Sequence, residues 1–423
     1  MAAFDIYYKV SITPRSGTYT YGSAVDVSDL VDVNGISSIK GQIDSTDYDM
    51  GAFKYSDVTI KGINRNGYFN DENDKRSIFF PFSRDLAKVN ITFTNTSGDT
   101  IVFNGLLNEE ATKLDFKNDV ISFRVLSLDS VIRSTNVSSG TISDGSLCSA
   151  AIKTILNVPA ITAILTYDAT KINVASDFII DLGSALEQMT TRDALNMLLV
   201  ASNSVMTLTS AGVMVIKSRA ATNTGSILNL YGPYDQKRRE NTVDLKDYNS
   251  GKHRMFNSFL INDTQVDNHD YVAAYGFRQK TINMDFITNN STEADIGATL
   301  VDEFNLPKIE LSVDVPTFVA KDSSLLDRVS LDWPLRITPY TGSFLPVIGD
   351  AVIGDATTKL PNRFGSLNID PGIAFKIIEI NHNPSNFITT LKLRQSGTTY
   401  ADGYYRTQYS NIVGFAVVGS AVI

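Results

Sequence analysis

The sequence has 423 residues, enough for two to four domains, and a formal net charge of −9 at pH 7. An acidic chain lacks the basic face that phosphate contacts require, so nucleic-acid binding is excluded as the main role. The single cysteine, Cys148, excludes an intrachain disulfide, and its apolar surroundings indicate a core residue rather than a nucleophile. No segment is as long and apolar as a membrane span, and the first residues do not resemble a signal peptide. We therefore expect a protein made in the cytoplasm.

The first part of the chain, residues 1–135, is predicted to be a β module. Short runs of alternating apolar residues are separated by turn clusters, which is the pattern of a sandwich or barrel. The alternating pairs are Val58 and Ile60, Ile91 and Phe93, and Ile101 and Phe103, and the turn clusters are 64–67 and 95–99. The run Ile121–Val125 alternates cleanly and should form a half-buried strand.

Residues 136–220 are predicted to be an α+β middle region, because the apolar period there changes to that of a helix. A first helix is indicated by Leu147, Ala151 and Ile155, and Pro159 should end it. A second helical stretch covers 182–201, with Thr191 as a plausible cap between two pieces.

The turn residues Ser210–Gly212 lie between two apolar runs, 205–208 and 213–216, and this pattern predicts a hairpin. The next stretch, residues 221–255, is polar and is predicted to be a linker or exposed loop. It contains the basic triplet Lys237–Arg239, which we interpret as a solvated loop rather than a nucleic-acid contact because the chain is acidic.

Residues 256–397 are predicted to form a second β module with one helix and a Pro- and Gly-rich loop region. The helix should be capped by Thr292, with Asp295 at the capping-box position, and should end before Pro307. A strand follows at 309–313, and the Pro- and Gly-rich stretch covers 333–372.

Two strands, Phe375–Ile380 and Phe387–Arg394, close the second module, and Asn381–Asn386 should join them as a hairpin loop. Their pattern of strand, loop and alternating strand repeats that of 102–107 and 121–129 in the first module. Because they lie on the most regular alternating strands, four residues are expected in the cores of the two modules: Phe123, Val125, Leu391 and Leu393.

We predict no catalytic residue, no cofactor-binding residue and no metal ligand. The three histidines, His253, His269 and His382, have no metal-ligand spacing and are expected in solvated loops. Asp44, Asp47 and Asp49 form an acidic cluster, but the glycine and closing glutamate of an EF-hand are absent, so a polar turn is favoured over a calcium site.

The order of these segments resembles that of bacteriophage tail and baseplate hub proteins of the T-even type, whose fold is also that of the base of type VI secretion spike proteins. The resemblance covers about residues 1–397. The matching segments are Val102–Gly105 with Ile121–Asp129, Thr191–Leu199 with the 205–216 hairpin, Tyr275–Arg278 with Leu306–Lys308, and the two closing strands. Unlike the secretion spikes, the sequence has no oligosaccharide-binding-like domain or long β-helix after the second module.

The resemblance implies a mainly β fold with an α+β middle, in which two tube-like β-barrel modules flank a helix-and-hairpin region. It also implies a homotrimer that forms a pseudo-sixfold ring. One side of the ring would dock on the tail tube or distal tail protein, and the other would carry a spike or central fibre protein. DNA would pass through the lumen without specific binding, and the protein would belong to the virion at the tail tip.

Two alternatives remain open from the sequence. A tail adhesin or depolymerase that binds or cleaves host-surface glycan is favoured a little by the clustered Tyr400, Tyr404 and Tyr405, although strand and interface packing is the preferred reading. A hexameric distal tail protein is the other alternative.

Residues 398–423 are predicted to be a connector followed by an apolar tail. Because an exposed apolar tail is an aggregation hazard, it must be covered, either by its own module or by a partner chain. We favour partner docking through Ile412, Val413, Phe415, Val417, Val418, Val422 and Ile423.

Overall fold

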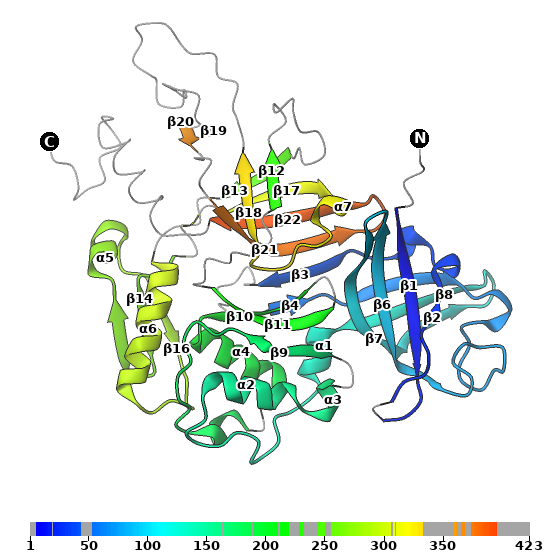
Figure 1. Cartoon of the computed structure of the whole chain (residues 1–423), viewed down its shortest axis with the longest axis horizontal. Helices are drawn as coiled ribbons and strands as arrows, with labels where there is room; N and C mark the ends of the chain where they lie inside the picture. Colours follow the sequence, from blue (N-terminus) through cyan, green and yellow to red (C-terminus); the bar gives the residue numbers. More distant parts are fainter. Residues whose placement is uncertain are drawn as a thin grey trace, which may run out of the picture.

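The computed structural model describes twelve stretches of the chain. These are residues 6–43 (except 19), 53–162, 165–209 (except 188), 212–219, 228–231, 244–249, 255–305, 308, 310–332, 359–362, 365–368 and 374–395. Strands dominate these stretches, so the expected mainly β fold is confirmed. The described strands form five sheets, and most of the helices lie in the middle part of the chain (Figure 1).

The first sheet is antiparallel and has the strand order β2-β1-β6-β7-β8-β5. Its strands are β1 (Tyr7–Arg15), β2 (Val25–Asp26), β5 (Val58–Ile63), β6 (Ser83–Asn95), β7 (Gly98–Asp115) and β8 (Val120–Ser127). The alternating residues bury one face, and Phe123 and Val125 are buried there as predicted. The turn expected at 64–67 is a short 3-10 helix, η3 (Arg65–Gly67), in which Asn66 and Gly67 both have a positive φ.

The second sheet has the order β12-β18-β21-β22-β17-β13. Its strands are β12 (Leu228–Tyr231), β13 (Asp244–Asn249), β17 (Glu310–Pro316), β18 (Arg328–Asp332), β21 (Ala374–Asn383) and β22 (Ile388–Gln395). A short helix, α7 (Thr317–Ala320), follows β17, and β19 (Lys359–Asn362) and β20 (Gly365–Asn368) form a separate hairpin. Leu391 and Leu393 are fully buried in this sheet, as predicted.

A strand from the N-terminal part of the chain completes the second sheet. β3 (Ile39–Ile43) pairs with β21, and β4 (Phe53–Tyr55) pairs with β3. Figure 1 shows β3 in blue beside the orange β21. Backbone hydrogen bonds therefore link residues on the two sides of the module boundary predicted at residue 135. That boundary stays a prediction.

The middle part packs helices on a three-stranded sheet of order β10-β11-β9. The elements are α1 (Leu128–Arg133), α2 (Cys148–Leu156), α3 (Pro159–Thr162), β9 (Thr166–Ile172), η4 (Gly183–Leu186), α4 (Thr191–Ala201), β10 (Ser204–Leu208) and β11 (Val213–Ser218). The two helical stretches and the hairpin agree with the sequence prediction. Pro159 opens α3 instead of simply stopping a helix, and the cap of α4 is Thr190, whose side chain accepts a hydrogen bond from the backbone N–H of Asp193.

A smaller unit follows, in which α6 (Asn290–Phe304) packs on the sheet β15-β14-β16. The strands are β14 (Ser258–Ile261), β15 (Thr264–Asp267) and β16 (Gln279–Ile282), and α5 (His269–Tyr275) lies between the last two. The predicted cap of the helix at Thr292 is wrong, because Asn289 caps it and accepts from the N–H of Ser291. Asn289 lies three residues before Thr292 and makes the kind of hydrogen bond expected of a cap, so the helix is longer by most of a turn.

Three further expectations differ from the structure. Neither large sheet is a closed barrel among the described strands, since β2 and β5, and β12 and β13, are end strands without a ladder between them. The stretch 221–255, expected to be a linker or loop, contains β12 and β13. Finally, Asn381, His382 and Asn383 belong to β21 and not to the hairpin loop.

Leu391→Ala should lower the free energy of unfolding by about 2–5 kcal/mol, because the fully buried side chain would leave a cavity between β17, β21 and β22. Chemical denaturation measures the change. Leu147→Ala is a matched control, since Leu147 is 45% exposed, and should cost within about 0.5 kcal/mol. Equal effects of the two variants would contradict the burial of this face.

Candidate functional site at the junction of the sheets

The structure describes two of the three histidines. His269 is exposed at the start of α5, and His253 lies outside the described residues. His382 was expected in a solvated loop, and this expectation is wrong: the residue is 6% exposed on β21. Its Nδ1 lies 2.8 Å from Thr389 Oγ1, which in turn donates to Thr317 Oγ1 at 3.1 Å. Burial lowers the pKa of His382 to about 4, so the ring is neutral at pH 7.

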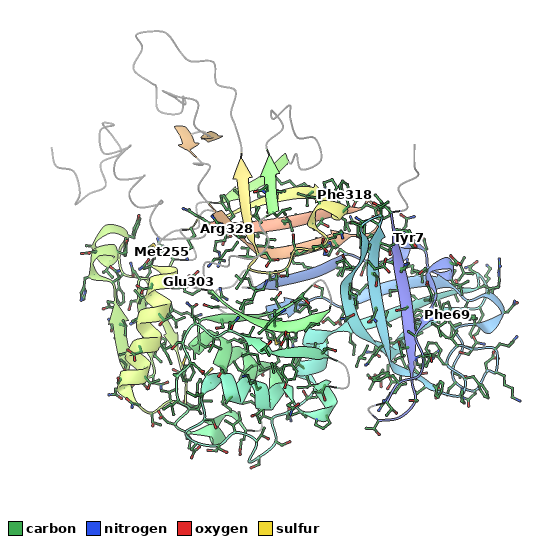
Figure 2. The ribbon with its side chains drawn as sticks, in the orientation of Figure 1. Tyr7, Phe69, Met255, Glu303, Phe318 and Arg328 are labelled. Atoms are coloured by element: carbon green, nitrogen blue, oxygen red, sulfur yellow. The ribbon has the colours of Figure 1, made fainter. Side chains whose placement is uncertain are left out.

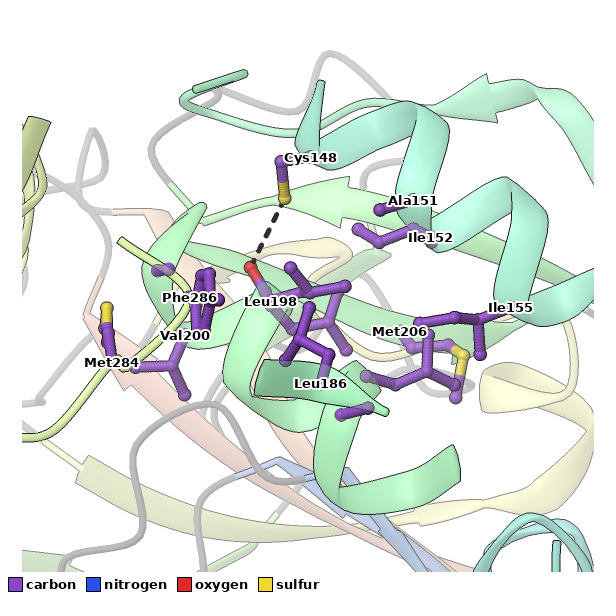
Figure 3. Close-up of a cluster of buried hydrophobic side chains, with 14 of the residues drawn as sticks. Cys148, Ala151, Ile152, Ile155, Leu186, Leu198, Val200, Met206, Met284 and Phe286 are labelled. Atoms are coloured by element: carbon purple, nitrogen blue, oxygen red, sulfur yellow. Dashed lines mark hydrogen bonds between the residues drawn. The ribbon is translucent and has the colours of Figure 1, made fainter. Parts of the chain in front are cut away.

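Cys148 is a core residue, as predicted. It begins α2 and is fully buried, with its Sγ 3.7 Å from the carbonyl oxygen of Leu198 (Figure 3). Burial raises the pKa of the Cys148 thiol well above its ordinary value, so the reactive thiolate is suppressed. Figure 3 also shows side chains of the following unit, Met284 and Phe286, against this core, so the middle part and the α6 unit share it.

Within the stretches that the structure describes, no group of three or more His, Cys, Asp or Glu side chains is placed to hold a metal ion, and no helix is long and apolar enough to span a membrane. The acidic cluster Asp44, Asp47 and Asp49 lies outside the described residues, as do the tyrosines at 400, 404 and 405 and the apolar tail from 412 to 423. Their predicted roles therefore stay predictions.

The first sheet, the second sheet and the middle part meet at one junction. The β3–β21 ladder is reinforced by an ion pair of 2.9 Å between Lys40 Nζ and Glu379 Oε1. Beside it, the ring of Tyr8 in the first sheet stacks on Phe387 in the β21–β22 turn, with 5.5 Å between ring centroids. The first sheet therefore contacts the second through the Tyr8 ring, close to the strand β3 that the N-terminal part of the chain contributes to the second sheet.

The segment after α7 ties the other parts to the second sheet. Asp322 accepts a hydrogen bond of 3.1 Å from Thr100 Oγ1 on β7. The Lys217 ammonium on β11 donates to Asp327 Oδ1 at 2.6 Å and to Ser324 Oγ at 2.7 Å. Because this lysine and aspartate are largely buried, their pairing is screened less by salt than a surface ion pair. The same short segment thus contacts the first sheet and the middle part.

A small hollow remains inside the junction, lined by Phe103 and Asn104 of β7, Leu208 of β10, Lys40 of β3 and His382 of β21, among others. It has room for a few water molecules. Asn104 Oδ1 is buried and has no hydrogen-bond partner in the protein. The hollow suits bound water better than a substrate.

Several large apolar side chains are exposed, among them Phe277 at 56% and two groups away from the junction. Leu147 and Ile179, which are 45% and 52% exposed, are paired by a β-bridge, with Leu182 nearby in sequence at 40%. At the far end of the first sheet, Phe116 in the β7–β8 turn is 81% exposed and Ile63 is 50% exposed. Exposed apolar patches of this kind are typical of protein–protein contacts. The sequence analysis did not single them out.

His382→Asn should flatten the dependence of stability on pH between about 6.5 and 4. The folded-state pKa lies below the ordinary value of 6.5, so in this window the unfolded chain binds a proton that the folded chain does not. Stability is therefore lost as the pH falls, by up to roughly 1.4 kcal/mol per pH unit from this one group. Denaturation at a series of pH values measures the slope, with exposed His269→Asn as the matched control. An unchanged slope in His382→Asn would show that the ring is already solvated.

No family model matches the chain, and no curated protein matches it. Among solved structures, a tail protein from Neisseria meningitidis superposes with a TM-score of 0.53 at 11% identity, over 92% of this chain and 97% of that one. A prophage MuSo2 43 kDa tail protein from Shewanella oneidensis gives 0.48 at 10% identity, over 92% and 96% of the two chains. The PdpA–VgrG complex of Francisella gives 0.47 at 10% identity, over 93% of this chain and 58% of that one. The resemblance to tail and baseplate proteins that the segment order indicates is therefore confirmed at the level of the fold.

Proposed function

We propose that the protein is a structural hub of a phage tail tip or baseplate. In this role it is a trimeric, pseudo-sixfold adapter that joins the tail tube or distal tail protein to a threefold spike or fibre. Its place is the virion, after synthesis in the host cytoplasm. It acts by packing against other chains and not by catalysis.

The observation that carries this proposal is the match of fold to the Neisseria tail protein over nearly the whole of both chains. A match of this extent includes both large sheets and the parts between them, and not one common module. The joined sheets also suit a protein that transmits force. The strand β3 comes from the N-terminal part and pairs with the second sheet, and backbone hydrogen bonds of this kind resist separation better than side-chain contacts alone.

The trimer follows from the repeated module. Each subunit supplies two sheets that end in similar hairpins, β7–β8 and β21–β22, so three subunits would present six comparable units in a ring. Rings of this type close through heterologous contacts whose rotation returns to the start. The acidic chain suits a lumen through which DNA passes without being held.

The isolated protein should sediment at the mass of three subunits. If the chain trimerises only on its partner, its complex with the tail tube protein should contain three copies of it. Electron microscopy of the same sample should show a ring with an axial hole. A stable dimer in both samples would contradict the hub, and a hexamer would point to a distal tail protein instead. Binding to a glycan array or degradation of polysaccharide would favour the adhesin or depolymerase.

Deleting residues 412–423 should leave the melting temperature of the isolated chain unchanged and abolish trimer formation or spike binding, because we propose that the apolar tail docks on a partner. Thermal unfolding and sedimentation of the truncated and full-length chains measure the two effects. A truncated chain that melts several degrees earlier yet assembles at the same concentration would place the tail in its own core.

A further inference from the structure

The wall of the hollow inside the junction contains a buried titratable ring, His382 of β21. Its Nδ1 lies 2.8 Å from Thr389 Oγ1 on β22, and Thr389 Oγ1 donates to Thr317 Oγ1 at the start of α7. A threonine hydroxyl has one proton, and Thr389 gives this proton to Thr317. Nδ1 must therefore carry a proton and donate it to Thr389. A second proton on the ring would enter at Nε2.

This row of side chains lies where the second sheet meets the first sheet. The backbone N–H of Thr317 donates to the carbonyl oxygen of Phe387, whose ring stacks on Tyr8 of β1. Figure 2 shows Phe318, the residue after Thr317, at the end of the second sheet that approaches the first sheet. The backbone of His382 also pairs with β3. A change in the charge of His382 therefore acts at the contact between the two sheets.

Among the described residues that line the hollow, none is a carboxylate. The charged side chains in its wall are Lys40 of β3 and Lys321 of the segment after α7. Their ammonium groups pair with Glu379 at 2.9 Å and with Asp322 at 3.2 Å, outside the hollow. A proton on His382 would add a further positive charge to this wall. The other polar lining residues carry hydroxyl or amide groups: Tyr55, Asn104, Thr207, Thr209, Ser323 and Ser324.

The closed hollow therefore favours the neutral ring. Burial lowers the pKa of His382 to about 4, whereas a ring released into water regains its ordinary pKa of 6.5. Between these two values the open junction binds a proton that the closed junction does not, so opening becomes more favourable as the pH falls. From pH 7 to pH 5, the fraction of open molecules should rise about 20-fold.

We propose that the junction is an acid-sensitive joint, in which protonation of His382 opens the hollow to water and loosens the second sheet from the first sheet and the middle part. The apolar core around Cys148 does not line the hollow and stays closed. The joint thus opens at a lower cost than the whole fold. The proposal does not depend on the oligomer or on the role in a tail.

The rate of thiol labelling measures this opening. Thr207→Cys places a thiol of similar size on β10, at a buried position in the wall of the hollow. The native Cys148 thiol, also buried, reports on the opening of the middle part's core. Dithiodipyridine, which reacts in acid, labels both thiols at low concentration, and mass spectrometry quantifies each one. Each rate is divided by that of a small free thiol at the same pH.

From pH 7 to pH 5, the relative rate at the introduced thiol should rise about 20-fold, and that of Cys148 should change little. The range ends above the pH at which carboxyl groups ordinarily titrate. His382→Asn keeps a donor near the position of Nδ1 and does not titrate, so it should remove the rise when combined with Thr207→Cys. His269→Asn, at an exposed position on α5, should keep the rise.

Three results would overturn the proposal. The relative rate at the introduced thiol could be the same at both pH values. The rate at Cys148 could rise as steeply, which would mean that the whole fold opens. His382→Asn could retain the full rise, which would assign the effect to another group.

Discussion

The backbone ladder between β3 and β21 is the constraint on which the rest of the structure depends. Residues 39–43 come from the N-terminal part of the chain, yet their hydrogen bonds are made to residues 379–382 near the other end. The second sheet is incomplete without them. Ser37, two residues before β3, donates its backbone N–H to the carbonyl oxygen of Thr59 on β5, so only a short length of chain separates the two sheets here. Every contact at the junction, from the Tyr8–Phe387 stack to the Lys217–Asp327 ion pair, acts within the geometry that this ladder sets.

Local patterns were sufficient to predict most elements. The i, i+4 spacing of Leu147, Ala151 and Ile155 gave α2, and the runs around Ser210–Gly212 gave the β10–β11 hairpin, because in both cases the interacting residues are close in sequence. The buried faces at Phe123 and Leu391 were also predicted, since alternation alone identifies the buried side of a strand.

Partners distant in sequence could not be predicted in this way. Ile39, Gly41 and Ile43 alternate like any strand of the first sheet, and alternation identifies the buried face without identifying the neighbouring strand. His382 was misplaced because the turn residues after it made the whole segment 381–386 look like a loop. The junction was not foreseen, since contacts such as those of Thr100 with Asp322 and of Lys217 with Asp327 form only through the tertiary fold.

The distribution of charge likewise differs between the whole chain and particular places in the fold. The chain is acidic as a whole, and on that ground the sequence excluded nucleic-acid binding. Yet the fold buries the Lys217–Asp327 ion pair where the middle part meets the second sheet, and there burial and not net charge decides the electrostatics. Bulk charge governs what approaches the surface, whereas local charge governs how the parts hold together. The tail hub that we propose needs both properties: a surface that does not hold DNA, and joints that keep its parts together.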